Sequence, residues 1–388
     1  MLHDIMNTSD LMTLGLSTPS TTTEITNILQ FNRNYMKYHG YISSIICIFG
    51  VMSNIVNIIV LTRRHMVTPT NCILTALAIT DMATMSIYFV YAVYFYIITQ
   101  PLDSYEHSKG WMYFVVVNNL AVITFHNMAM WLTVSLAVFR YIFVCHHVVA
   151  NQWCSLDRAK LTIFIIVVVS ILVCVPNYFL YQVKDLQDFY TEASNRTNNA
   201  TANWKGYWIE KSEFIQQNPL YQPITFWIYG VIIKIAPCIL LTILSTLIIM
   251  TMHQASVRRK RLLSQSNSRH NEEMSAEHNR TTMMLVMVVL FFVVTEFPQG
   301  ILAGISGLND TFFNQVYSNL GDVMDLLVLI NSAINFLLYC IMSQQFRDTF
   351  KNLFLCSFVR NFNNGSITLK NGIHTNHYSS VKTEVTQV

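Results

Sequence analysis

Seven long stretches of predominantly apolar residues divide this chain, and they constrain its fold more than any other feature. They are Gly40–Thr62, Cys72–Thr99, Trp111–Val144, Leu161–Tyr181, Tyr221–Met252, Thr281–Gly304 and Tyr317–Met342. Each is long enough to cross a lipid bilayer as a helix, which takes about 20 apolar residues. Because lipid offers the backbone no hydrogen-bond partners, such segments fold as helices. The sequence therefore predicts an all-α, seven-transmembrane helix bundle.

Composition argues against a large soluble protein with buried helices. Apolar residues make up 53% of the chain and charged residues 12%, which is about half the charged share of an ordinary soluble domain. Soluble helices also keep a polar stripe, and residues 164–175 and 285–294 show almost none. Residues 1–15 lack a basic start followed by an apolar run, so we expect no signal peptide and insertion through the first span.

The distribution of Lys and Arg predicts the orientation in the plasma membrane. One set of loops, the C-terminal tail and the inner end of the third span together hold 16 of the 24 cations, and positive charge gathers on the cytoplasmic side. We therefore expect the N-terminus outside and the C-terminus inside. Four glycosylation sequons agree, because they all fall on the predicted outer side. Their asparagines are Asn7, Asn195, Asn199 and Asn309.

The regions outside the spans suggest four parts of the chain. We expect an extracellular N-terminal segment over residues 1–39 and the transmembrane bundle over residues 40–342. Residues 344–359 alternate Phe with Lys and Arg, which predicts a short amphipathic eighth helix on the cytoplasmic lipid surface. Residues 360–388 form a polar tail that we expect to be disordered. Cys356 is a candidate for palmitoylation, the Ser and Thr of the tail for arrestin recruitment, and Thr386-Gln387-Val388 for a PDZ protein.

Several classes of protein lack support in the sequence. The eight cysteines lie in the spans or on the predicted cytoplasmic side, so we expect no extracellular disulfide. Metal-ligand motifs, phosphate-binding glycine loops and nucleophile motifs are missing, so we expect neither an enzyme nor a metal site. No pair of matching broken helices suggests a transporter, and nothing predicts a nucleic-acid partner.

Polar side chains inside the spans mark the functional residues, because a charge in hydrocarbon is strongly unfavourable. The charged candidates are Asp81, Lys234, Glu296 and Asp325. The neutral ones in the same spans are His126, Asn54, Asn331 and Asn335.

In sequence order, these residues and their neighbours resemble the rhodopsin-like (class A) G-protein-coupled receptors. The resemblance rests on Leu77-Ala78-Ile79-Thr80-Asp81, Phe139-Arg140-Tyr141, Pro237, Phe291 to Pro298, and Asn331-Ser332-Ala333-Ile334-Asn335-Phe336-Leu337-Leu338-Tyr339. More narrowly, Thr62-Arg63-Arg64, Pro69-Thr70-Asn71 and Thr295 to Gly300 resemble invertebrate myosuppressin and FMRFamide-like neuropeptide receptors. The chain departs from the class A pattern at Phe139, where an acid is usual, and at Glu296, where tryptophan is usual. It also departs at Phe336, where proline is usual.

The resemblance implies roles in activation and in coupling to a heterotrimeric G protein of the inhibitory type. The residues are Asn54, Asp81, Arg140, Tyr141, Pro237, Phe292, Pro298, Asn331, Asn335 and Tyr339. It also implies a sodium ion at Asp81, Asn331 and Asn335. Because Ala129 stands where a serine ligand is common, a hydrated network without an ion remains equally open. Pro298 removes a backbone donor and is expected to act as a hinge in the sixth span.

The resemblance also implies that the expected ligand-binding residues face one another across a pocket, with His126 opposite Glu296 and Lys234 nearby. Asn119 and His126 share one face of the third span, and Glu296 and Gln299 share one face of the sixth. Lys234 and Asp325 complete the set. We predict a His126–Glu296 pair, with or without Lys234, that a cationic ligand competes for. A permanent Lys234–Glu296 bridge that only fixes packing is the alternative.

The acidic outer loops favour a cationic ligand, since a negative field raises the local concentration of a basic peptide. The resemblance to FMRFamide-like receptors implies an extracellular neuropeptide of the amidated Arg-Phe type as the ligand, and the acidic loops agree with such a cationic peptide. A G-protein-coupled receptor for a non-peptide ligand and a membrane transporter are the alternatives.

Overall fold

The computed structural model describes residues 19–99, 107–185, 187, 206–263, 291, 292 and 294–355. Within this part, six helical segments are long and apolar enough to cross a membrane. They are Thr26–Leu61, Pro69–Ile98, Lys109–Cys145, Leu156–Phe179, Tyr221–Ala255 and Phe313–Ile341. Much of the predicted sixth span, Thr281–Gly304, falls outside the described residues, but residues 294–306 are helical.

Four long helices build the first half of the bundle. They are α2 (Pro19–Leu61), α3 (Pro69–Ala92), α4 (Lys109–Cys145) and α6 (Leu156–Cys174), and they are extended or joined by η1 (Arg64–Met66), η2 (Val93–Ile98), α5 (His147–Trp153) and η3 (Val175–Phe179). Helix α3 packs against α2 and α4, and α6 packs against α3 and α4. Thr68 caps α3, and its side chain accepts a hydrogen bond from the backbone N–H of Asn71.

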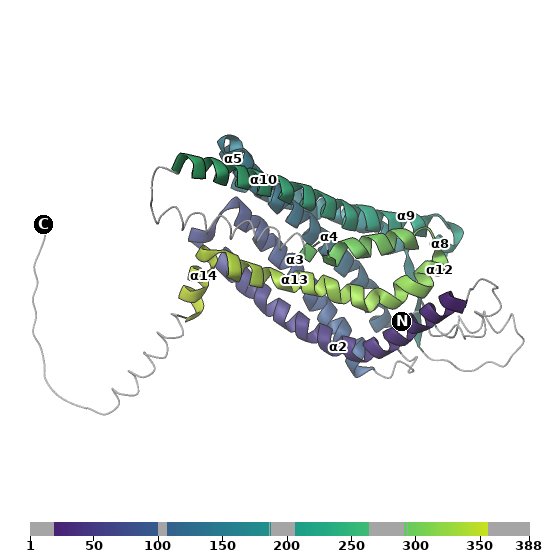
Figure 1. Cartoon of the computed structure of the whole chain (residues 1–388). Helices are drawn as coiled ribbons and strands as arrows, with labels where there is room; N and C mark the ends of the chain where they lie inside the picture. The colour runs from purple at the N-terminus through teal and green to yellow at the C-terminus, as the bar shows by residue number, and fades with distance from the viewer. Residues whose placement is uncertain are drawn as a thin grey trace, which may run out of the picture. The chain divides into compact units, whose positions relative to one another are not determined.

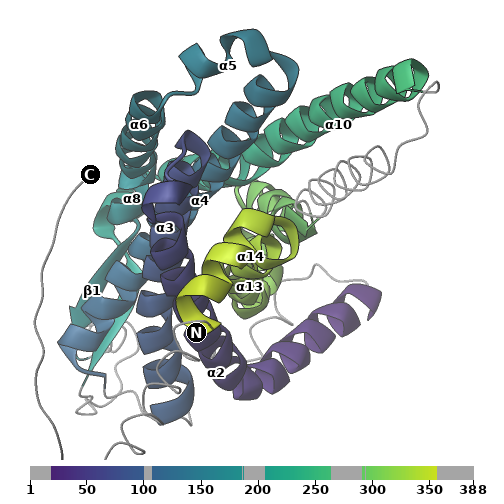
Figure 2. The same ribbon diagram turned by 90° about the vertical axis from the view of Figure 1, so that its left-hand side faces the viewer.

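The second half contains α8 (Glu213–Gln217), α9 (Tyr221–Trp227), η4 (Ile228–Ile235) and α10 (Ala236–Leu263), followed by residues 294–306 and the last span. The last span consists of α12 (Asp310–Phe312), η5 (Phe313–Tyr317), η6 (Ser318–Leu320) and α13 (Gly321–Met342). Helices α2, α3, α4, α10 and α13 run side by side (Figures 1 and 2). Helix α5 and the C-terminal end of α10 lie at one end of the bundle, here called the Arg140 end (Figure 1).

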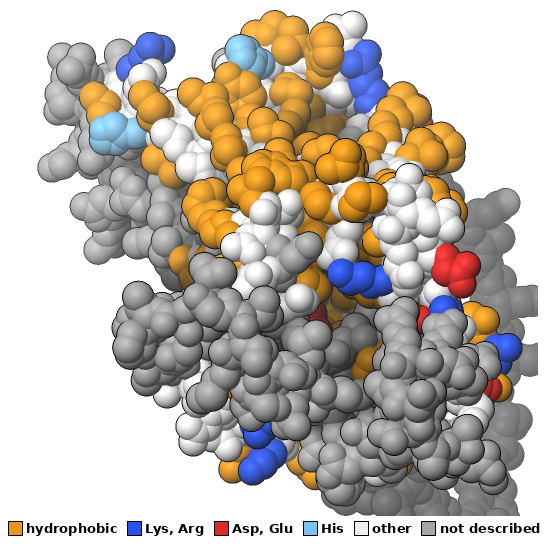
Figure 3. Space-filling view, turned by 90° about the vertical axis from the view of Figure 1, so that its right-hand side faces the viewer, with side chains coloured by type: hydrophobic (Ala, Val, Ile, Leu, Met, Phe, Trp, Pro, Cys, Tyr) orange, Lys and Arg blue, Asp and Glu red, His pale blue; other side chains and the backbone are white. Residues whose placement is uncertain are grey.

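Helix α6 shows why the bundle needs lipid around it. Apart from Ala159, Ser170 and Cys174, its described side chains are at least partly exposed, and Phe164 is 65% exposed. Hydrophobic side chains also cover a large continuous part of the described surface in Figure 3. Exposed apolar patches of this extent are unfavourable in water and suit a hydrocarbon solvent.

The first helix is longer than the predicted span. It begins at Pro19 rather than at Gly40, so the segment predicted over residues 1–39 is helical in its second half. The apolar pattern marked only the stretch that can sit in lipid, whereas a helix can continue beyond it on polar residues. Asn32 in this extension donates a hydrogen bond to Asn319 Oδ1 at 3.2 Å.

A short antiparallel hairpin, which was not predicted from the sequence, lies among the helices of the described residues. Strand β1 (Tyr181–Asp185) pairs with β2 (Tyr207–Lys211) in the register Tyr181↔Lys211. Lys184 Nζ of β1 lies 3.4 Å from Glu210 Oε2 of β2. The hairpin marks the second end of the bundle, here called the hairpin end. The β-forming run Tyr207-Trp208-Ile209 is too short to stand out among long apolar spans.

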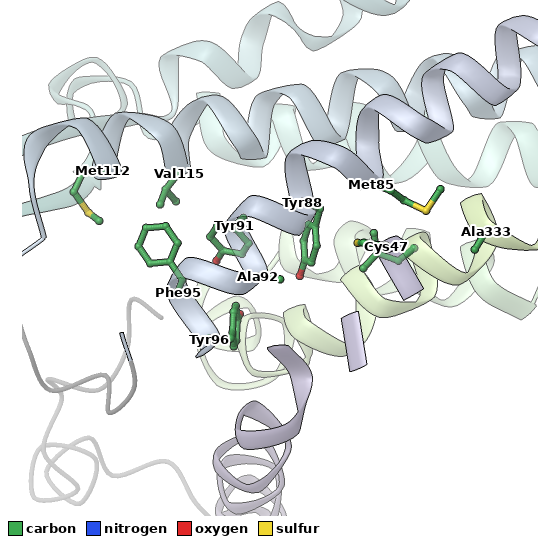
Figure 4. Close-up of a cluster of buried hydrophobic side chains, with 11 residues drawn as sticks. Cys47, Met85, Tyr88, Tyr91, Ala92, Phe95, Tyr96, Met112, Val115 and Ala333 are labelled. Atoms are coloured by element: carbon green, nitrogen blue, oxygen red, sulfur yellow. The ribbon is translucent and has the colours of Figure 1, made fainter. Parts of the chain in front are cut away.

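Aromatic side chains of the second span fill the core near the hairpin end. Tyr88, Tyr91, Phe95 and Tyr96 are buried together and point towards residues of the first, third and last spans (Figure 4). Tyr94, beside them, stacks on Trp111 with ring centroids 3.5 Å apart. Packing of this kind fixes the second span against its neighbours.

Residues 343–388 form a separate unit. Its described part contains α14 (Gln344–Phe350) and η7 (Lys351–Leu355). The Ser343 side chain caps α14 by accepting from the N–H of Phe346 at 3.1 Å. Cys356 and the tail over residues 360–388 lie outside the described residues, so their predicted roles stay predictions.

Candidate functional site

Three ionisable side chains meet in the centre of the bundle, and we call them the buried triad. Lys234 Nζ of η4 donates to Glu296 Oε2 at 2.6 Å. His126 Nε2 of α4 lies 3.1 Å from the same oxygen and 2.7 Å from Lys234 Nζ. Lys234 and Glu296 are both 0% exposed. Burial in apolar surroundings disfavours isolated charges, so the opposite charges stabilise each other.

Local backbone features bring the triad together. Lys234 lies in the π-helical segment η4, where one wider turn changes the direction of the side chains. Gly230 and Gly300 let the fifth span and residues 294–306 approach closely. A Cβ atom at Gly300 would lie 3.0 Å from Lys234 Cβ and 2.8 Å from an Ile235 side-chain carbon. Larger residues at these positions would push Lys234 away from Glu296.

The predicted contact between His126 and Glu296 is present, and so is the Lys234–Glu296 bridge that stood as its alternative. One carboxylate oxygen serves both. A ring nitrogen either donates or accepts a hydrogen bond, so Nε2 bonds to Glu296 when it is protonated and to Lys234 when it is not. The other carboxylate oxygen, Oε1, accepts from Asn331 Nδ2 at 3.2 Å. Asn331 was predicted to lie in a polar cluster with Asp81. Its side-chain amide donates a hydrogen bond to Glu296 of the triad.

A cavity of about 290 Å³ opens between the triad and the hairpin end. Four of the predicted ligand-binding residues line it: Asn119, His126, Gln299 and Asp325. Aromatic side chains form much of its wall, from Tyr88, Tyr181, Phe226, Tyr229, Phe313 and Tyr317. Tyr181 lies on strand β1, and its hydroxyl can donate or accept a hydrogen bond. The space suits a small ligand or the end of a larger one.

Lys234 and Glu296 do not line this cavity. A ligand in the cavity can reach His126 and not the carboxylate behind it, which differs from the predicted direct competition for Glu296. The difference arises because Lys234 and His126 together cover the carboxylate. Of the three triad residues, His126 is the one that faces the cavity.

Asp322 and Asp325 form a second acidic group, one helical turn apart at the start of α13. Tyr88 donates to Asp325 Oδ2 at 3.0 Å, and Tyr96 donates to Asp322 Oδ1 at 2.5 Å. His39 of α2 lies behind them, with Nε2 2.9 Å from the Tyr88 hydroxyl. Among the described residues, no Lys or Arg lies within ion-pair distance of either carboxylate. Asp325 therefore offers the cavity a carboxyl group that no described Lys or Arg pairs with.

The predicted activation residues connect the spans below the triad. Asn335 donates to Asp81 Oδ2 at 2.7 Å, and Asn54 donates to the backbone oxygen of Ser332 at 3.2 Å. These bonds join the first, second and last spans. A cavity of about 30 Å³ next to them is lined by Asp81, Asn331 and Asn335 among others. It has room for a water molecule, and sodium binding stays a prediction.

An apolar cluster continues this line towards the Arg140 end. Met130, Cys238 and Phe292 are packed together in it, and Pro237 is buried beside Cys238. Arg140 and Tyr141 lie near the C-terminal end of α4, where Tyr141 packs against Ile248 and Met252. These contacts connect the third, fifth and sixth spans.

The remaining predicted sites are distributed along the chain. Pro298 lies within helical residues 294–306, and Tyr339 lies in α13. Asn309 is exposed, and its Oδ1 accepts from the N–H groups of Thr311 and Phe312. The other three sequons, at Asn7, Asn195 and Asn199, lie outside the described residues.

Comparison with known proteins decides the family. The family model described as serpentine type 7TM GPCR chemoreceptor Srw matches residues 41–357, which is most of the chain. The chain belongs to this family of G-protein-coupled receptors. The receptor therefore crosses the membrane seven times as a helix bundle, as predicted from the apolar stretches, and it is a multi-pass protein of the plasma membrane rather than an enzyme.

Individual relatives of the receptor agree with this assignment. It is 28% identical over 359 residues to the G-protein coupled receptor dmsr-1 of Caenorhabditis elegans, covering 84% of this chain and 70% of the relative. It is 29% identical over 325 residues to the sex peptide receptor of Drosophila melanogaster, covering 82% and 73%. The FMRFamide receptor of the same fly is 24% identical over 339 residues, covering 86% and 56%.

Two residues of the receptor's site, His39 and Asn118, were not predicted from the sequence. His39 and Tyr88 hold Asp325 in place, and Asn118 lines the cavity beside Asn119. Asn118 could have been found, because it lies four residues before Val122 and eight before His126 on one helical face. His39 could not, because it precedes the apolar stretch that marked the first span.

Proposed function

We propose that this chain is a receptor for an extracellular neuropeptide, of the amidated Arg-Phe type that FMRFamide and myosuppressin represent. Support comes from the names of its relatives, which include a sex peptide receptor and an FMRFamide receptor. The observation that carries the proposal is the cavity at the hairpin end, with its aromatic wall and with Asp325 lacking a cationic partner among the described residues.

In this proposal the hairpin end faces the outside of the cell. The excess of Lys and Arg in the opposite loops and tail supports that orientation, since positive charge is retained on the cytoplasmic side. The N-terminus is then extracellular and the C-terminus cytoplasmic. The peptide enters the cavity from outside, and an inhibitory-type G protein binds at the Arg140 end. Arrestin, a PDZ protein and membrane lipid are the further partners on the cytoplasmic side.

The peptide's arginine pairs with Asp325. A guanidinium forms strong charge-assisted hydrogen bonds with a carboxylate, and the aromatic wall accepts the adjacent phenylalanine ring. Asn119, Gln299 and His126 complete the binding site, and Lys234 and Glu296 act through His126. Asp325 is the better partner than Glu296 because it lines the cavity, whereas Glu296 is covered by Lys234 and His126.

Activation is a population shift between two arrangements of the bundle. A peptide group that contacts His126 changes which triad partner its ring nitrogen bonds to. The altered contacts reach residues 294–306 through Glu296 and the last span through Asn331. The apolar cluster of Met130 and Phe292 then transmits the shift to Arg140.

A cell-based assay tests the function. The full chain is expressed in cells that carry G-protein activation sensors, and amidated Arg-Phe peptides such as Phe-Met-Arg-Phe-amide are applied. We expect a saturable response that is absent from cells without the chain. If a panel of amidated Arg-Phe peptides gives no response while surface staining shows the protein at the plasma membrane, the proposed ligand class is wrong.

A receptor for a non-peptide ligand is the second candidate. The family description names chemoreceptors, and a cavity of about 290 Å³ could enclose a small molecule. A panel of small cationic molecules in the same assay separates the two. Responses to these alone would favour the second candidate.

A further inference from the structure

Asn118 of α4 has a buried amide oxygen for which the described part of the chain provides no hydrogen-bond partner. The side chain is 1% exposed, it lines the cavity, and no described residue donates a hydrogen bond to its Oδ1. Its amide nitrogen is already used, because Nδ2 donates to Asn119 Oδ1 at 3.3 Å. Buried polar atoms are almost always hydrogen-bonded, so an acceptor left open at a cavity wall indicates a missing donor.

Asn127 on the same helix provides a comparison. It is also 1% exposed, and its Oδ1 also lacks a partner among the described residues. However, Asn127 lines neither the large nor the small cavity, and its Nδ2 contacts Cys174 Sγ at 3.9 Å. Of these two asparagines, only Asn118 can therefore meet a molecule in the large cavity.

We propose that Asn118 Oδ1 accepts a hydrogen bond from the C-terminal carboxamide of the peptide, which makes the receptor selective for amidated ligands. This inference rests on the proposed function and names a recognition residue within it. A primary carboxamide has N–H donors that Asn118 Oδ1 can accept. A free C-terminal carboxylate has no hydrogen to donate, so its oxygens would face the Asn118 oxygen with like partial charge.

The acid on the other side of the cavity agrees with this choice of ligand group. Asp325 lines the same cavity without a cationic partner among the described residues. A carboxylate in the ligand would add a second negative charge near it, whereas a carboxamide adds none. Asp325 thus selects a cationic side chain, and Asn118 selects the neutral, hydrogen-donating end of the chain.

The expected effect is a change in selectivity rather than in potency alone. A site built to bond a ligand N–H loses roughly 10–100-fold when that bond cannot form. Wild-type receptor should therefore respond to Phe-Met-Arg-Phe-amide at roughly 10–100-fold lower concentrations than to the free acid. Asn118→Leu removes the acceptor while keeping the shape, so it should lower the ratio of the two potencies towards one.

Asn118→Asp separates the acceptor oxygen from the bond to Asn119. This variant keeps an oxygen and loses the amide nitrogen, as Asn118→Leu does. Because the added carboxylate repels the free acid, the ligand compared with the amide here is the neutral methyl ester of the same peptide, whose C-terminal group has no N–H donor. If Oδ1 recognises the ligand, Asn118→Asp should keep the preference for the amide over the ester and Asn118→Leu should lose it. If the bond to Asn119 is what matters, both variants should lose the preference, which would overturn the proposal.

Asn127→Leu is the matched control, and potencies are compared at equal surface amounts of receptor. It should leave the amide-to-acid ratio as in wild type. Asn118→Ala replaces Asn118→Leu if the larger side chain prevents surface expression. Equal losses of potency for amide and acid in the Asn118 variants would overturn the inference and leave the proposed function intact. A wild-type receptor that answers neither peptide would refute the proposed function and the inference with it.

Discussion

Two of the acidic groups inside the bundle, one at Glu296 and one at Asp325, differ in whether the protein supplies a cation for them. Glu296 is fully buried, with Lys234, His126 and Asn331 all in contact with its two oxygens. Asp325 has a tyrosine hydroxyl as its donor and faces a cavity. The first group has its cation within the protein, so it can hold two helices together. The second leaves its charge open to a ligand.

The comparison assigns different roles to residues that look alike in the sequence. Both acids interrupt apolar spans, and both would be marked as ligand-binding by that criterion alone. Their surroundings separate them, because a charge that is covered by the protein's own cation affects stability and switching. A charge that is open to a cavity affects binding. Changes at the two groups should therefore alter different measurements.

The largest effect is expected from breaking the triad. Lys234→Met leaves the Glu296 carboxylate buried without its cation, which should lower the free energy of unfolding by about 3–5 kcal/mol. The thermal stability of the detergent-solubilised receptor and its amount at the cell surface measure this loss. The double variant Lys234→Met with Glu296→Gln should recover much of it, because no buried charge is left alone. Equal instability of the single and double variants would refute the charge argument.

Asp325→Asn should mainly affect ligand binding, whereas Lys234→Met mainly affects stability. Removing the open charge should lower the potency of Phe-Met-Arg-Phe-amide by roughly 10–150-fold, since hydrogen bonds to charged groups contribute about 1.5–3 kcal/mol. Dose-response curves at matched surface amounts give the potency, and thermal stability should change little. Asp322→Asn is the control, since Asp322 does not line the cavity. A similar loss in both variants would point to a general field effect.

Gly300→Ala tests whether close helix approach holds the triad. The added methyl group would lie 3.0 Å from Lys234 Cβ, and overpacking of this kind costs about 1–3 kcal/mol of stability. The melting temperature should therefore fall. Gly304→Ala is the matched control, because a Cβ there meets nothing within 4 Å. An unchanged melting temperature for Gly300→Ala would show that the two helices can separate without strain.

The smallest effect is expected at Tyr88. Tyr88→Phe removes the hydroxyl between His39 and Asp325, and it should lower stability by about 0.5–1.5 kcal/mol. Thermal unfolding measures the change. Tyr94→Phe keeps its stack on Trp111 and loses a hydroxyl for which the described residues provide no hydrogen-bond partner, so it should be near neutral. Equal effects of the two variants would mean that the bonds to His39 and Asp325 contribute little.

The contact between His126 and Glu296 was predicted correctly, whereas the access of a ligand to Glu296 was not. His126 and Glu296 were placed together because the resemblance to class A receptors implies that these two positions face each other, while helical spacing showed which residues share a face of each helix. Spacing along one helix could not predict that Lys234 covers the same oxygen, because that depends on the wider turn of η4 and on the approach of Gly230 to Gly300. The open oxygen of Asn118 was likewise invisible, since an unmet bond is defined by every neighbour around it.

By itself the sequence determined the helical spans, the polar residues within them and the family they resemble. These follow from local chemistry, because lipid requires apolar helices and tolerates few charges. The tertiary structure alone decided which carboxylates are paired with a cation of the protein and which face a cavity. It also decided where the β1–β2 hairpin forms and how far the first helix extends. Those features depend on contacts between segments that are far apart in the chain, and the sequence of one helix does not determine how closely the others pack against it.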